Sequence, residues 1–123
     1  MKDSIVQVKS FDFAVEIICL CQLLVDERHE YNLSKQLVRS STSIGANIRE
    51  GRRAQSSADF VAKMSISLKE AEETRYWIEL LAAASYIEEH KASDLIGKCD
   101  EIIRMLASIV KNDERKKLLT LNS

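Results

Sequence analysis

Residues 33–81 read LSKQLVRSSTSIGANIREGRRAQSSADFVAKMSISLKEAEETRYWIELL. In the first part of this stretch, apolar residues recur on one face of a helix, at Leu33, Leu37, Ile44 and Ile48, with Gly51 after them. The small polar residues between them normally weaken a helix, because they compete for backbone hydrogen bonds. The periodicity on either side still predicts a helix, one with thin middle turns that a neighbouring helix can approach closely.

A second helix follows after a short turn near residues 54–57. Ser56 and Asp59 have the spacing of a capping box directly before an apolar run. One face of this helix carries Phe60, Met64, Leu68, Ala71, Ile78 and Ala82. A different face carries Ile66, Trp77, Leu80, Leu81 and Ala84. Because a bundle core needs only one stripe, we expect Ile66, Trp77, Leu80 and Leu81 at an interface with another subunit.

Basic side chains lie on the outer arc of the first of these helices. They are Lys35, Arg39, Arg49, Arg52 and Arg53, and Glu50 is the only acidic residue against them. Two interpretations are open at this point: an ordinary solvated face, or a site for the phosphates of a nucleic acid.

Three polar residues stand close to the apolar stripes, at Asn47, Glu50 and Arg75. They predict an interhelical hydrogen-bond or ion-pair network that fixes helix register; a ligand-contacting cluster is the alternative.

The charge of the chain is balanced overall and uneven locally. The formal net charge is −1 with a pI of about 6.1, which excludes a globally basic nucleic-acid binder. Residues 32–57 nevertheless carry five basic side chains against one acidic, and residues 70–90 carry six acidic side chains against Arg75. Complementary patches of this kind can steer self-association or attract a charged partner.

The 123 residues predict one all-α domain spanning 1–123, since proline is absent and only three glycines occur. We expect four helices over about 10–28, 32–53, 57–86 and 93–116, with Ser10, Asn32 and Ser93 as N-caps. Residues 1–9 form either an extended arm or further helical turns, and residues 118–123 are expected to fray. Short connections imply antiparallel neighbours, and therefore an up-down-up-down four-helix bundle.

No arrangement of residues predicts an active site, a metal site or a cofactor. Neither His29 nor His90 has a partner at ligand spacing, and Cys19 and Cys21 point to different faces of a helix. The three cysteines are expected to be free thiols in a reducing cytoplasm. The polar start of the chain is unlike a signal peptide, and no apolar run is long enough to span a membrane.

Residues 36–50, QLVRSSTSIGANIRE, resemble the S-I-G/P-A/S-N-I-x-E core of the 23S rRNA intervening-sequence protein family, catalogued in part as "four helix bundle protein". Residues 59–71 and 73–81 are similar to its third helix, and residues 9–14 to its opening. The resemblance implies a bacterial four-helix bundle that assembles into a ring-like homopentamer. It also implies a relation to the accessory proteins of diversity-generating retroelements, whose basic pentamers bind nucleic acid and a reverse transcriptase.

Two functions follow as hypotheses. The first is a non-enzymatic, cytoplasmic homo-oligomer, a pentamer by the resemblance, that acts as a scaffold for a protein or ribonucleoprotein partner. The second is nucleic-acid binding by Lys35, Arg39, Arg49, Arg52 and Arg53, multiplied around the ring. In either case the expected partners are other copies of the chain, together with nucleic acid or a nucleic-acid-handling protein. No membrane is expected as a partner.

Overall fold

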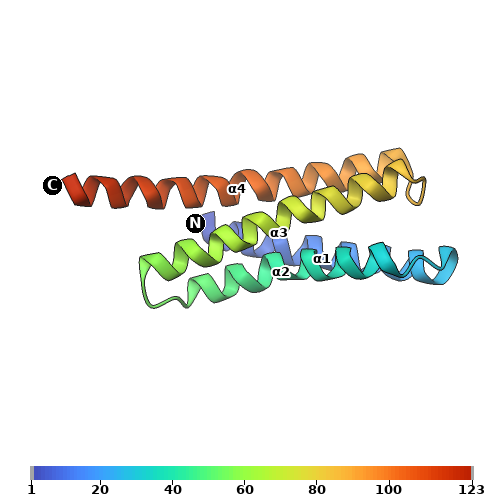
Figure 1. The fold of residues 1–123 in the computed structure, drawn as a ribbon, viewed down its shortest axis with the longest axis horizontal. Coiled ribbons are helices and arrows are strands. Elements are labelled where there is room, and N and C mark those ends of the chain that lie inside the picture. Colours follow the sequence, from blue (N-terminus) through green and yellow to red (C-terminus); the bar gives the residue numbers. More distant parts are fainter. Residues whose placement is uncertain (1, 123) are drawn as a thin grey trace.

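The computed structural model describes residues 2–122, and it describes the side chains of residues 5–116, 118 and 119. Four helices make up this part of the chain: α1 (Lys2–Arg28), α2 (Asn32–Arg52), α3 (Ser57–Ala83) and α4 (Glu89–Asn122). The connections are short, over residues 29–31, 53–56 and 84–88, and the chain reverses direction at each of them (Figure 1). The prediction of an all-α four-helix bundle is confirmed.

Each helix packs against two neighbours, in the order α1–α2–α3–α4 and back to α1. The α2–α3 pair is in the most extensive contact, and the α1–α4 pair is in the least. Ion pairs bridge the α1–α4 side, where Lys9 lies 3.0 Å from Glu101 and Glu16 lies 3.0 Å from Lys98. Hydrogen bonding to Glu16 raises the pKa of Lys98 above its ordinary value.

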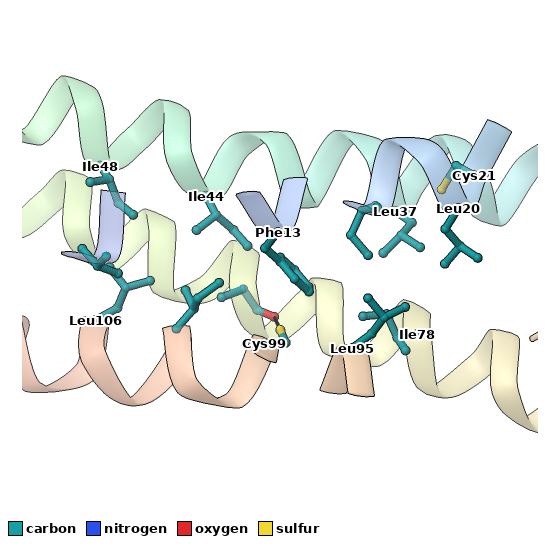
Figure 2. Close-up of a cluster of buried hydrophobic side chains, with 14 of the residues drawn as sticks. Phe13, Leu20, Cys21, Leu37, Ile44, Ile48, Ile78, Leu95, Cys99 and Leu106 are labelled. Carbon is teal, nitrogen blue, oxygen red and sulfur yellow. Dashed lines mark hydrogen bonds between the residues drawn. The ribbon is translucent and has the colours of Figure 1, made fainter. Parts of the chain in front are cut away.

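The core lies along the bundle axis and takes one apolar stripe from each helix (Figure 2). The predicted stripe of α2 is buried at Leu37, Ile44, Ile48 and Gly51. In α4, apolar residues at alternating spacings of four and three are all buried: Leu95, Cys99, Ile102, Leu106 and Ile109. In α3 the buried positions include Met64, Ala71 and Ile78, as the spacing predicted.

The N-terminal segment is helical, and Ser10 does not begin a helix. Val6 is buried in the core, so the segment before Ser10 has an apolar anchor that stabilises additional helical turns. Ser10 is fully buried, and its hydroxyl donates a hydrogen bond to the Gln7 carbonyl three residues back. The first helix therefore begins at Lys2 and not at residue 10.

The start of α2 is stabilised by Glu30 and not by Asn32. Its carboxylate accepts hydrogen bonds from the backbone N–H of Leu33 (3.0 Å) and of Ser34 (2.7 Å), and from the Ser34 hydroxyl. The anion thus satisfies two of the free donors at the helix N-terminus. Burial alone would raise the pKa of Glu30, but these hydrogen bonds outweigh it and hold the pKa below its usual value.

The ends of α3 and α4 also differ from the prediction. Ser56 caps α3 as expected, since its hydroxyl accepts the Asp59 N–H at 3.1 Å. The helix ends at Ala83, three residues early, because Ser85 adopts a left-handed conformation with φ of 63°. The Tyr86 N–H then reaches the Leu81 carbonyl and closes the turn. The last helix begins at Glu89, so Ser93 lies inside it, and it continues through residues 117–122.

We predict that Glu30→Gln lowers the free energy of unfolding by about 1 to 2 kcal/mol, because the helix loses its capping anion. A depressed carboxyl pKa contributes stability that is present above the usual glutamate pKa of about 4.3 and disappears as the pH falls through the folded-state value. The difference between wild type and variant should therefore shrink on acidification. Urea unfolding of both proteins from pH 7 to pH 3 measures this difference in the free energy of unfolding. Glu27→Gln, at an exposed position, is the control. An equal difference at all pH values would contradict the capping role.

Candidate interaction surfaces

The predicted basic face of α2 is divided by ion pairs. Arg39 binds two acids of α3, with Nη1 3.2 Å from Glu70 and Nη2 2.6 Å from Glu73. The Trp77 indole N–H also donates to Glu73, at 3.3 Å. Hydrogen bonding to Glu73 raises the pKa of Arg39 above its ordinary value. The charge of Arg39 is thus neutralised within the bundle, and this residue joins α2 to α3.

The other four cations lie at the two ends of α2. Arg52 donates a hydrogen bond to the Gln7 side chain on α1, at 2.6 Å. Lys35, Arg49 and Arg53 are exposed and have no carboxylate partner in the described part of the chain. Arg49 and Arg53 are one helical turn apart, whereas Lys35 is about 21 Å from Arg49 along α2, at 1.5 Å for each of 14 residues. The structure therefore offers one close pair of free cations and a separate third.

The residues expected at a subunit interface fall into two groups. Ile66 is 42 % exposed, and Trp77 and Leu80 are half-buried. Leu81 is 0 % exposed and belongs to the core, because it shares the bundle-facing stripe of α3 with Ile78. Leu81 thus has no surface with which to contact a second copy, and three of the four residues remain available.

Asn47, Glu50 and Arg75 are not brought together. The Asn47 side-chain amide donates to the Ser43 carbonyl within α2. Glu50 lies 3.3 Å from Lys63 and joins α2 to α3. Arg75 lies 2.8 Å from Asp100 on α4, and this hydrogen bond raises the pKa of Arg75. Glu50 and Arg75 each make an interhelical ion pair, and the two pairs lie at separate places.

An apolar trough between α1 and α2 is the surface that the sequence reasoning missed. It has a volume of about 620 Å³ and runs along α1 from Gln7 to Ile18. Further along the same two helices, a second hollow of about 480 Å³ extends it from Ile18 to Asp26. Three large side chains of α1 that line it are exposed, Phe11 at 57 %, Val15 at 47 % and Ile18 at 43 %, and Val8, next to the lining residue Gln7, is 60 % exposed. These residues are three, four and three positions apart, so they form a second apolar stripe along the helix. The spacing is visible in the sequence itself.

Within the described residues there is no group of three or more His, Cys, Asp or Glu side chains that could hold a metal ion. Burial raises the pKa of Cys21 to about 11 and that of Cys99 to about 12, which disfavours thiolate formation. The Cys99 thiol donates to the Ala71 carbonyl at 3.2 Å. Across residues 2–122, no helix combines the length and the apolar character that a membrane span requires.

We predict that Cys19 alone reacts rapidly with a maleimide in the folded protein. Cys19 is exposed, whereas Cys21 and Cys99 are buried and have raised pKa values. Mass spectrometry at pH 7.5 should show one modification before denaturant is added and three afterwards. Rapid labelling of Cys21 or Cys99 in the native protein would contradict the packing described above.

The structure is that of an all-α four-helix bundle with exposed apolar and basic surfaces. A family model described as "23S rRNA-intervening sequence protein" matches residues 2–108, and the chain belongs to this family. A crystal structure at 1.70 Å, of a protein of unknown function from the S23 ribosomal protein family of Bacteroides thetaiotaomicron VPI-5482, is similar with a TM-score of 0.89 and 50 % identity. The match covers 90 % of this chain and 99 % of that one. No curated protein matches.

Proposed function

We propose that this chain is a non-enzymatic, self-assembling protein of the bacterial cytoplasm. Its up-down-up-down bundle is the protomer of a ring of five, and the ring is a scaffold for a protein or ribonucleoprotein partner. The observation that carries the proposal is the second apolar stripe of α1, where four large side chains are 43–60 % exposed beside an apolar trough. A contiguous apolar surface of this kind marks a site of association.

The number five rests on the resemblance of residues 36–50 to the family core, which implies a ring-like homopentamer. Burial of the α1 stripe explains why a bundle with a complete core keeps so much apolar surface. The family relation supports a shared architecture, since the similar crystal structure covers nearly the whole chain at 50 % identity.

We predict a mass of about five protomers of 14.0 kDa each by size exclusion with light scattering at micromolar concentration. Because apolar burial drives the association, the mass should persist at high salt, where exposed ion pairs are screened. A 14.0 kDa species at both low and high salt would overturn the proposed assembly.

A second candidate function is nucleic-acid binding, as the resemblance to retroelement accessory proteins implies. The observation that favours it is the absence of carboxylate partners for Lys35, Arg49 and Arg53 among the described residues. Three such cations per protomer become fifteen in a ring of five, and phosphate contacts add across copies. Arg39 contributes little to this site, since two acids of α3 already bind it.

We predict that replacing Arg49, Arg52 and Arg53 with Ser weakens binding to a generic short RNA equally for all sequences and flattens its salt dependence. The matched control replaces three exposed cations of α4, Arg104, Lys111 and Arg115, with Ser. Fluorescence anisotropy from 50 to 300 mM salt measures both variants. Equal affinity of the α2 variant and the wild type for the RNA would exclude this basic end of α2 as the RNA-binding site. Light scattering would show whether the variant still assembles.

A further inference from the structure

We propose that the C-terminal end of α4 docks on an anionic lipid surface. We define this end, the α4 tip, as residues 111–119, which read KNDERKKLL. Docking on a surface needs no spanning helix, and it departs from the sequence-based expectation that no membrane is a partner. The inference draws its strength of binding from the proposed ring and goes beyond it, because it names a further partner.

The α4 tip lies at the edge of the bundle and not within it. The last turns of α4 extend past the α2–α3 connection and past the start of α1, so no other helix of residues 2–122 accompanies them (Figure 1). Ile109 is the last buried residue of α4 in the described chain. The family model matches only residues 2–108. The tip is therefore open to a partner, and it follows the part of the chain that matches the family.

The tip exposes two adjacent leucines next to basic side chains. Leu118 is 59 % exposed and Leu119 is 67 % exposed. Lys111, Arg115 and Leu118 are spaced by four and three residues, so they share one side of the helix, and all three are exposed. This side of the tip thus combines positive charge with apolar surface.

The acidic residues of the tip lie toward the bundle. Asp113 and Glu114 line a hollow of about 300 Å³ whose other wall is the first turns of α3, at residues 57, 58, 61 and 62. At about 100° per residue, Arg115 lies well away from the wall that these two acids form. The outward side of the tip is therefore more basic than the sequence of residues 111–119 alone indicates.

Charge also differs between the two ends of the bundle. The α4 tip and residues 49–57, around the α2–α3 connection, lie at the same end (Figure 1). Together these two segments carry seven basic residues against three acidic ones. The connections at the opposite end, residues 26–30 and 84–90, carry five acidic residues against Arg28. An anionic surface is thus attracted to the end that carries the tip and repelled by the other.

The exposed leucines favour a lipid surface over a nucleic acid. Lysine and arginine bind the phosphates of both, so the cations alone do not discriminate. Leucine side chains gain free energy when they enter the boundary between lipid headgroups and acyl chains. Leu118 and Leu119 sit directly beside the cations, where a docked headgroup layer would receive them.

The symmetry of the proposed ring adds the tips together. One tip has only two exposed leucines, so a single protomer binds weakly. In a cyclic ring, equivalent residues lie at the same height along the symmetry axis, and the five tips therefore lie in one plane. A flat membrane contacts all of them at once, which raises the overall affinity without any new contact.

The test is co-sedimentation of the full chain with vesicles of phosphatidylglycerol and phosphatidylcholine in equal parts. Wild type should bind them, and it should not bind vesicles of phosphatidylcholine alone. Replacing Leu118 and Leu119 with Ser should weaken binding roughly tenfold or more without changing the charge. Replacing Lys111 and Arg115 with Ser should weaken it and flatten its salt dependence. Leu23→Ser is the control, since Leu23 is 55 % exposed near the other end of α1.

Light scattering on the same samples separates this inference from the proposed ring. Loss of vesicle binding in the leucine variant, with wild-type mass retained and the Leu23→Ser control unaffected, supports the tip as the lipid contact. A wild-type pentamer that ignores anionic vesicles, or a leucine variant that binds them as well as wild type does, would overturn the inference and leave the ring standing. Binding of the tip to a short RNA without binding to vesicles would also overturn it, in favour of nucleic acid. A monomeric wild type would overturn the ring and the joint action of the tips.

Discussion

The close approach of α2 and α3 is the contact on which the rest of the bundle depends. Two buried hydroxyl hydrogen bonds join these helices: Thr74 Oγ1 lies 2.8 Å from Ser40 Oγ, and the Ser67 hydroxyl donates to the Ile44 carbonyl at 2.8 Å. Residues of this size allow the helix axes to come near each other, and each buried hydroxyl keeps a partner, so that no desolvation cost remains uncompensated. The run of small polar residues in α2 is therefore explained by tertiary packing, which overrides its poor helix propensity.

Ion pairs then fix the register of the helices around this contact. Arg39 joins α2 to α3, Arg75 joins α3 to α4, and Glu16 with Lys98 joins α4 to α1. Each is partly exposed, so its contribution to stability is small, but together they determine which cations stay available. A face that looks uniformly basic in sequence is thereby divided into a paired centre and unpaired ends.

Periodicity in the sequence was enough to predict the four helices and most of the core, because burial follows helical spacing directly. The caps were harder to predict. Glu30 acts in place of Asn32 because backbone geometry before α2 brings a longer acid to the free N–H groups. Ser85 and His29 adopt positive φ without being glycine, so the usual sequence signal for a helix end is absent there. Neither the capping by Glu30 nor the positive φ of Ser85 and His29 corresponds to a sequence pattern that predicts it.

The position of the exposed apolar surface was also only partly predictable from the sequence. The sequence indicates two apolar faces on α3. In the structure, however, Leu81 is buried, and the larger exposed apolar stripe lies on α1. The α1 stripe at Val8, Phe11, Val15 and Ile18 has regular spacing, but spacing alone does not say which of two stripes faces the core. That choice is made by α2 and α4, which cover Val6, Phe13 and Ile17 and leave the other stripe open. An outward stripe beside a trough of small residues is thus a property of the packed bundle, and it can be recognised only when both helices are in place.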